Sequence, residues 1–193
     1  NNIFLFARPG YFIRERGSSE EDRYSSGPRN AIKSTVVNYD WKNFQILAPA
    51  LQNLKKYYKP KKLILIGHSG GAYQGGTIHG KVPGLVDINI LISCPCDWET
   101  RKKLSNGKKW ETKSQLKELK KNSPSFNYKD IDLKSLNILI VGKDDKNTAP
   151  GVSKYYYDLL KKKKLQVKLH IIDGGHGLRS MPTIGSIIKE YIN

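Results

Sequence analysis

Residues 63–71 read Leu-Ile-Leu-Ile-Gly-His-Ser-Gly-Gly, an apolar run that leads into a glycine-rich turn. Small residues follow from Ala72 to Gly80, so the predicted order is strand, tight turn and helix. The G-x-S-x-G spacing around Ser69 is typical of a nucleophile elbow, in which the serine occupies a strained turn. Side chains at positions 67 and 71 are expected to collide with the neighbouring strand and helix. Ser69 is therefore the first candidate for a catalytic residue.

Five short apolar runs are predicted to form strands. They are residues 3–7, 63–66, 86–93, 136–141 and 166–172. The three middle runs are nearly continuous in isoleucine, leucine and valine, as in strands that are buried on both faces of a parallel sheet. A parallel sheet with helical crossovers is the expected arrangement.

Segments with helical spacing separate these runs. Apolar residues at steps of three and four predict a helix over 41–58, with a cap at Asp40 and a kink at Pro49. Two further helices are expected over 152–164 and 182–191. Alternating strands and helices predict an α/β fold with right-handed crossovers.

Two polar stretches interrupt this alternation. Residues 14–30 are rich in turn formers and are expected to be a long surface loop. Residues 97–133 follow a central strand, at the position where lids and substrate-contacting segments lie in such sheets. Two interpretations of this segment are open, a lid-like insertion and a charged surface decoration. The length of 193 residues predicts one domain over 1–193.

The net charge of +17 raises the question of nucleic-acid binding. Seven of the 34 basic residues are arginines, which leaves 27 lysines, and these are spread along the chain. Scattered lysines indicate solvated surface helices rather than a specific nucleic-acid site. No apolar run has the length of a membrane-spanning helix, which favours a soluble protein. The compartment is open, with the cytoplasm slightly favoured. The oligomeric state is open.

The cysteines and histidines do not indicate a metal site. Cys94 and Cys96 are two residues apart, and on an extended segment their side chains point to opposite sides, so reduced thiols are expected. The four histidines are scattered, without metal-ligand spacing. We expect no metal and no organic cofactor.

A serine hydroxyl is a weak nucleophile unless an imidazole takes its proton and a carboxylate orients that imidazole. Asp144 and Asp145 follow the predicted strand 136–141, and His176 follows the predicted strand 166–172 in the sequence Gly-Gly-His-Gly. The ends of parallel strands meet at one edge of a sheet, where Ser69 is also expected. His68, His79 and His170 are expected to have structural roles.

These motifs resemble the α/β-hydrolase family, particularly its small esterase, dienelactone-hydrolase and prolyl-oligopeptidase-like branches. The resemblance extends from about Leu63 to the C-terminus. In that family the acid stands in a G-x-x-D-x-x-x-x-P loop, and the loop from Gly142 to Pro150 implies Asp145, with Asp144 as the alternative. A less common family arrangement would use Asp97. The implied triad is Ser69, Asp145 and His176.

The resemblance also implies two donors to an oxyanion, the first of which is the backbone N–H of Gly70. Arg8-Pro9-Gly10-Tyr11 resembles a loop that follows a later strand in some members. The strand with the second donor would then lie upstream of Asn1, and the sheet would be truncated at its N-terminal edge. Alternatively, residues 3–7 form the donor strand, with the N–H of Gly10 or Tyr11 in the hole and another strand at 34–38.

Together these observations predict an α/β-hydrolase fold, with a mostly parallel sheet that has helices on both faces. The expected function is that of a serine hydrolase that cleaves a carboxylic ester or related small acyl substrate through an acyl-enzyme. Esters are favoured over peptides. A serine peptidase-like hydrolase is the first alternative, and a non-catalytic hydrolase-fold binding protein is the second.

Overall fold

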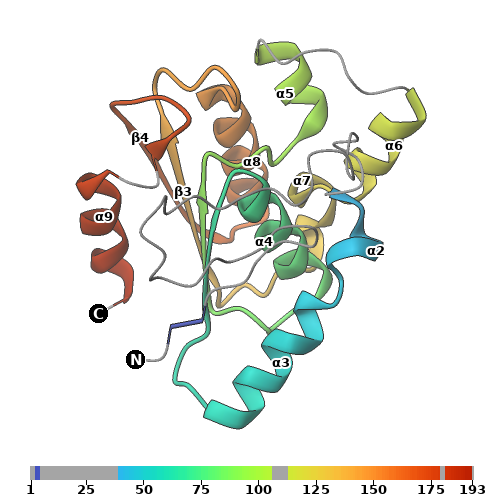
Figure 1. Cartoon of the computed structure of the whole chain (residues 1–193), viewed down its shortest axis with the longest axis vertical. Coiled ribbons are helices and arrows are strands. Elements are labelled where there is room, and N and C mark those ends of the chain that lie inside the picture. The colour runs from blue at the N-terminus through green and yellow to red at the C-terminus, as the bar shows by residue number, and fades with distance from the viewer. Residues whose placement is uncertain (1–2, 5–38, 106–112, 179–180, 193) are drawn as a thin grey trace, which may run out of the picture.

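The computed structural model describes residues 3–4, 39–105, 113–178 and 181–192. Four parallel strands form one sheet in the order β1-β2-β3-β4 (Figure 1). They are β1 (Ile64–His68), β2 (Ile88–Ile92), β3 (Leu136–Gly142) and β4 (Gln166–Ile172). Four of the five predicted strands are therefore confirmed to within two residues at each end. Of the predicted strand 3–7, only residues 3 and 4 are described, and they are not part of a strand.

Helices connect the strands, as parallel pairing requires. The crossover from β1 to β2 contains α4 (Gly70–Lys81), and the crossover from β3 to β4 contains α8 (Pro150–Lys162). Helix α9 (Pro182–Ile192) follows β4. The described part of the segment between β2 and β3 contains four short elements: α5 (Trp98–Leu104), α6 (Lys113–Lys121), α7 (Pro124–Asn127) and the 3₁₀ helix η1 (Tyr128–Asp130).

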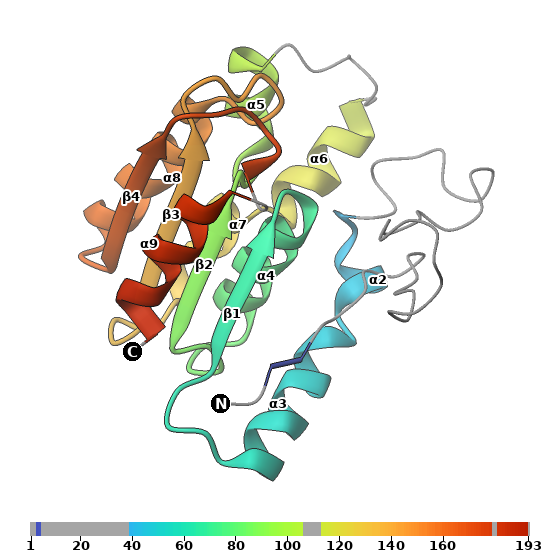
Figure 2. The same ribbon diagram turned by 60° about the vertical axis from the view of Figure 1, so that its left-hand side comes forward.

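The strand register aligns the carboxyl ends of the four strands. His68 pairs with Ile92, Ile92 with Ile140, and Ile140 with His170. The loops that follow the strands therefore emerge at one edge of the sheet. This edge lies at the top of Figure 2, where the strand arrows end and where α5 is also found.

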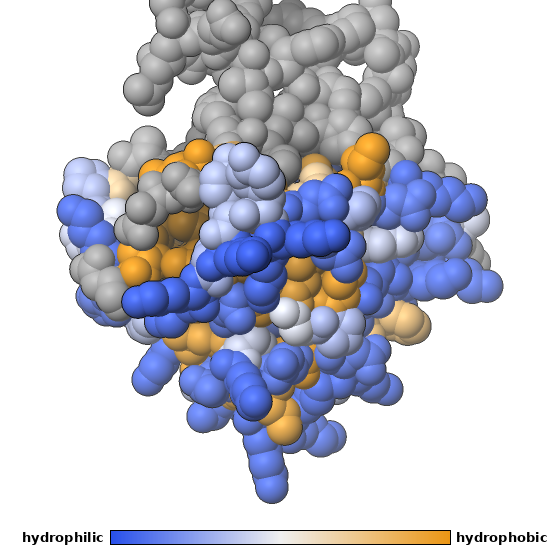
Figure 3. All heavy atoms as spheres, turned by 90° about the horizontal axis from the view of Figure 1, so that it is seen from below, coloured by the Kyte–Doolittle hydropathy of each residue, from blue (hydrophilic) through white to orange (hydrophobic). Residues whose placement is uncertain are grey.

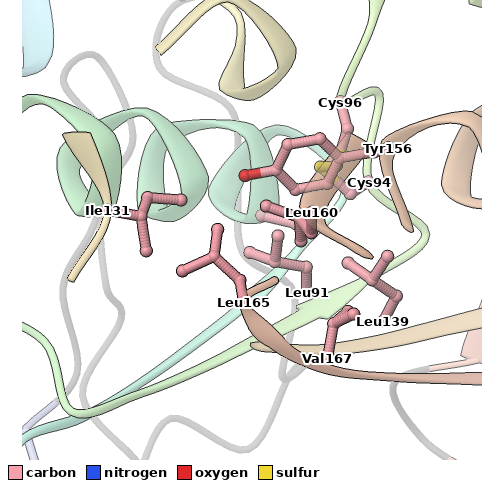
Figure 4. Close-up of a cluster of buried hydrophobic side chains, with 10 residues drawn as sticks. Leu91, Cys94, Cys96, Ile131, Leu139, Tyr156, Leu160, Leu165 and Val167 are labelled. Carbon is pink, nitrogen blue, oxygen red and sulfur yellow. A yellow bond between two sulfur atoms is a disulfide. The ribbon is translucent and has the colours of Figure 1, made fainter. Parts of the chain in front are cut away.

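Helices cover both faces of the sheet, as predicted (Figure 2). On one face, Leu91 and Leu139 of the sheet pack with Tyr156 of α8 in a cluster that also includes Ala72 of α4 (Figure 4). On the other face, alternate strand residues form a second cluster with α9. It contains Ile90, Ile138, Ile184 and Ile187. Every residue of β2 is buried, which explains why its sequence is apolar except at Asn89.

The predicted helix over 41–58 is two helices, α2 (Trp41–Phe44) and α3 (Leu47–Tyr58). Asp40 caps α2 as expected, because its side chain accepts a hydrogen bond from Lys42 N at 3.1 Å. The chain turns at positions 45 and 46, so Pro49 stands in the first turn of α3 rather than at a kink. Proline is tolerated there because the amides of a first turn have no partner within the helix.

The expectation of reduced cysteines is wrong, because Cys94 and Cys96 form a disulfide. The opposite-side argument assumed that the extended strand continues through both residues. In the structure β2 ends at Ile92, and Ser93 has a positive φ of 48°. The chain thus leaves the strand conformation before Cys94, and the period-two alternation of side chains no longer applies.

The surface at the amino ends of the strands is largely hydrophilic (Figure 3). Exposed lysines stand in the connections just before three strands: Lys62 before β1, Lys134 before β3 and Lys164 before β4. This surface lies at the opposite end of the sheet from Ser69. None of the helices in the described part of the chain has the length and hydrophobicity of a membrane-spanning segment.

His79 lies in the last turn of α4, is 1 % exposed, and shares a hydrogen bond of 2.9 Å with Ser135 Oγ. Burial lowers the pKa of His79 to about 4 despite the nearby charges of Asp132 and Asp87. Between pH 6.5 and about 4 the unfolded chain therefore binds the extra proton. The free energy of unfolding is expected to fall by about 3 kcal/mol as the pH is lowered through this window.

Urea unfolding between pH 4 and 7 measures this loss, and His79→Gln provides the comparison. Glutamine can still form a hydrogen bond to Ser135, but it does not titrate, so the variant should have a much flatter pH dependence over this range. An unchanged slope in the variant would show that another group is responsible.

Candidate active site

Ser69 stands at the predicted strained turn between β1 and α4. It is a non-glycine residue with a positive φ of 52°, and its backbone N–H donates to Ile92 O at 2.8 Å. A Cβ atom added to Gly67 would lie 2.5 Å from the carbonyl carbon and oxygen of Gly71. The steric prediction is therefore confirmed at position 67. It is wrong at position 71, where an added Cβ would have nothing within 4 Å and would enter open space.

The loops after β3 and β4 pack directly against each other. The backbone N–H of Asp144 donates to Gly174 O at 3.1 Å, and that of Lys143 donates to Ile172 O at 2.8 Å. Gly142 needs to be glycine here, because an added Cβ would collide with the backbone of Gly174. This close packing brings the loop with Asp145 next to the loop with His176.

His176 lies within hydrogen-bond distance of both Ser69 and Asp145. Nε2 of His176 is 3.0 Å from Ser69 Oγ, and Nδ1 is 3.0 Å from Asp145 Oδ2 and 3.2 Å from Asp145 Oδ1. Asp145 is 2 % exposed, whereas 29 % of the His176 side chain is exposed. An imidazole held between a hydroxyl and a buried carboxylate can take the hydroxyl proton, which is the chemistry of an activated serine nucleophile.

The Asp145 carboxylate accepts several hydrogen bonds from its own loop. Oδ1 accepts from the backbone N–H of Asn147 at 2.9 Å and of Thr148 at 2.8 Å, and Oδ2 accepts from Thr148 Oγ1 at 2.7 Å. Burial alone would raise the pKa of Asp145, but hydrogen bonds from His176 and Thr148 outweigh it and hold the pKa well below its usual range. Asp145 therefore stays ionised at neutral pH and favours the proton on Nδ1 of His176.

The other sequence candidates lie elsewhere. The Asp144 side chain is exposed. Asp97 caps α5 by accepting from Thr100 N at 2.7 Å, and it also accepts from Ser125 Oγ at 2.6 Å. His170 Nε2 lies 2.9 Å from Tyr191 OH. Of the three aspartates considered as the acid, it is Asp145 that the structure brings to His176.

Three polar residues at this site were not identified from the sequence as functional. Thr148 orients Asp145 as described, and His68 Nε2 donates to the backbone carbonyl of His176 at 2.8 Å. Asn147 Nδ2 lies 3.1 Å from His176 Nε2. Thr148 and Asn147 could have been suspected, because they belong to the Gly142 to Pro150 loop. The sequence contains no signal for the contact of His68.

Of the expected oxyanion donors, Gly70 is buried and begins α4. Amides in the first turn of a helix have no carbonyl partner within it, so the Gly70 N–H is available to a ligand. Gly10 and Tyr11 lie outside the described residues. Among the residues that the structure describes, no group of three or more His, Cys, Asp or Glu side chains could hold a metal ion.

The sequence of residues 11–190 matches the prolyl oligopeptidase family. No curated protein matches the chain. Among solved structures, it is similar to an acylaminoacyl peptidase of Pyrococcus horikoshii, with 19% identity over 77% of this chain and a TM-score of 0.63. A puromycin-hydrolysing peptidase of Mycobacterium tuberculosis is 15% identical over 79% of the chain, with a TM-score of 0.63. Dipeptidyl peptidase 4 of Porphyromonas gingivalis is 12% identical over 81%, with a TM-score of 0.60.

At these identities the structural similarity shows the fold, and the fold is that of the α/β-hydrolases. The matched regions cover 27% of the acylaminoacyl peptidase, 24% of the puromycin-hydrolysing peptidase and 22% of dipeptidyl peptidase 4. The chain thus spans about a quarter of the length of each of these structures.

Proposed function

The chain belongs to the prolyl oligopeptidase family, a family of α/β-hydrolase-fold serine hydrolases, and on this premise we propose that it hydrolyses peptide bonds through Ser69, His176 and Asp145. The observation that carries this proposal is the hydrogen-bonded series from Ser69 Oγ through both ring nitrogens of His176 to Asp145. Each of the three residues follows a different strand, at the shared carboxyl edge of the sheet.

In the proposed mechanism, Ser69 Oγ attacks the substrate carbonyl while Nε2 of His176 takes its proton. Asp145 holds the proton on Nδ1 and stabilises the imidazolium that forms. The N–H of Gly70 donates to the oxyanion, a contribution worth roughly 3 kcal/mol for one donor in comparable enzymes. His176 then gives its proton to the leaving group, and a water molecule, activated in the same way, releases the acyl group from Ser69.

The preference for esters in the sequence analysis is not supported by the comparisons. The family is named for an oligopeptidase, and the similar structures are peptidases. We therefore propose peptides rather than esters as substrates. The ester alternative is distinguished by comparing kcat/KM for a peptide anilide and for the nitrophenyl ester of the same peptide.

The second oxyanion donor and the segment 97–133 complete the proposal. The N–H of Gly10 or Tyr11 remains our candidate for the second donor. Within 97–133, we propose that α5 is the part that faces the substrate, because Arg101 contacts the loop that carries Asp145. The elements α7 and η1 pack against α4, and an added Cβ at Gly76 or Gly80 would collide with α7, so we assign both elements to the core.

A fluorophosphonate probe tests the proposed nucleophile directly. The full chain is expected to be labelled at Ser69, located by mass spectrometry of the digested protein, because the probe reacts with a hydroxyl that an imidazole has activated. Ser69→Ala should not be labelled. Ser186→Ala, which changes an exposed serine on α9, should be labelled like the wild type.

Absence of labelling in the folded wild type would contradict the enzymatic proposal. It would favour the remaining alternative, a hydrolase-fold protein that binds ligands without catalysis. Labelling at a serine other than Ser69 would also contradict the assignment.

A further inference from the structure

Asn147, which is outside the proposed triad, also reaches the reactive nitrogen of His176. Its Nδ2 lies 3.1 Å from Nε2 of His176, and Ser69 Oγ lies 3.0 Å from the same nitrogen. Because Asp145 holds the ring proton on Nδ1, Nε2 has a single lone pair with which to accept. Two donors therefore compete for one acceptor in the resting site.

Arg101 determines which end of the Asn147 amide faces His176. A guanidinium group can only donate, and its Nη2 lies 2.6 Å from Asn147 Oδ1, while its Nε donates to Asn147 O at 3.0 Å. The amide oxygen must therefore face Arg101. The amide nitrogen is left to donate to His176.

Arg101 is itself held by helix α5. Its guanidinium carbon lies 4.6 Å from the ring centroid of Trp98, which is 2 % exposed, in a cation–π contact. The end of α5 makes a second link to the same loop, because Ser105 Oγ accepts from Ala149 N at 3.1 Å. The position of α5 is thus transmitted to the side chain that contacts the imidazole.

We propose that Arg101 and Asn147 are positioning residues that couple α5 to His176, with the Asn147 amide holding the neutral imidazole until it accepts the Ser69 proton. This inference rests on the proposed function. When Ser69 Oγ bonds to the substrate carbon, its proton moves to Nε2, and Nε2 becomes a donor. It can then no longer accept from Asn147 Nδ2, so this hydrogen bond exists only before proton transfer.

The surroundings of the ring indicate the direction of the effect. Asp145 and Thr148 face Nδ1, Ser69 and Asn147 face Nε2, and His68 contacts the backbone carbonyl of His176. A donor to Nε2 stabilises the neutral ring over the protonated ring, so it opposes transfer of the Ser69 proton to Nε2. Movement of α5 that withdrew Arg101 would release the amide and favour this transfer.

The rate of fluorophosphonate labelling as a function of pH tests this coupling. In Asn147→Ala, the midpoint of the acidic limb is expected to move upward by roughly 0.5–1 pH unit, because the donor to the neutral ring is lost. Arg101→Met should move it in the same direction. Arg101→Lys, which keeps the charge but loses the two-donor fork, should do so as well. Lys103→Met, which removes a charge from an exposed residue of the same helix, should leave the midpoint in place.

The double variant separates coupling from a remote charge effect. If Arg101 acts through Asn147, Arg101→Met should add no shift in the Asn147→Ala background. An equal shift in both backgrounds would show that Arg101 acts as a distant charge, and the absence of a shift in Asn147→Ala would also overturn the proposal.

A measurement that does not depend on catalysis tests this inference separately from the proposed function. In ¹⁵N spectra of histidine-labelled full chain at high pH, the Nε2 resonance of His176 is expected to move downfield in Asn147→Ala, as for an imidazole nitrogen that has lost a donor. If this change occurs in a protein that the probe does not label, the contact stands and the proposed function fails. An unchanged resonance overturns the contact itself, whatever the labelling result.

Discussion

Replacement of Asp145 by asparagine is expected to lower kcat/KM, and the rate of fluorophosphonate labelling, by about 10⁴-fold. Asparagine can accept from the backbone amides of Asn147 and Thr148 through Oδ1, as the carboxylate does. Its NH₂ group would then face Nδ1 of His176 and donate to it. The ring proton moves to Nε2, and the imidazole loses the lone pair that accepts the proton of Ser69.

The neighbouring residue provides the control for this prediction. Asp144→Asn makes the same chemical change one residue earlier, on an exposed side chain, so activity and labelling should be nearly unchanged. Circular dichroism and thermal unfolding of both variants establish that the fold is intact. A large loss of activity in Asp144→Asn with a small one in Asp145→Asn would show that Asp144 is the acid.

Much of the fold could be predicted because each strand is a short, continuous apolar run in the sequence. The runs at 86–93 and 136–141 are nearly continuous in isoleucine, leucine and valine, as is typical of strands that are buried on both faces, and both form central strands. The same logic identified the ends of the strands, and in a parallel sheet those ends share an edge. The sequence therefore predicts that Ser69, Asp145 and His176 lie close together.

Contacts between distant segments could not be predicted in this way. Arg101 reaches Asn147 because α5 folds over the edge of the sheet, and nothing in the sequence of a lysine-rich helix indicates that arrangement. The disulfide was missed because the prediction extended strand geometry past Ile92, where the chain turns. The proposed donors Gly10 and Tyr11 lie outside the described residues, so that part of the site remains a prediction.

Gly67→Ala is expected to disrupt the elbow, and this is the second large effect. The added methyl group would lie 2.5 Å from the carbonyl carbon and oxygen of Gly71 and 2.6 Å from Ala72 N. These are backbone atoms in the first turn of α4, so they can move only if the turn itself shifts. We expect a loss of about 3 kcal/mol in the free energy of unfolding, at the upper end of the usual range for overpacking. Labelling should fall by about 100-fold, because Ser69 would shift relative to His176.

The Gly71→Ala variant distinguishes the roles of the two glycines of the motif. With nothing within 4 Å of the added methyl group, the free energy of unfolding should be unchanged or slightly higher, because alanine favours helix over glycine. Urea unfolding and labelling of both variants give a two-by-two comparison. If Gly71→Ala keeps full stability but is not labelled, the space next to Gly71 is needed by the ligand rather than by the fold. If it unfolds like Gly67→Ala, the turn is tighter than its geometry indicates, and the steric explanation of the elbow must extend to both glycines.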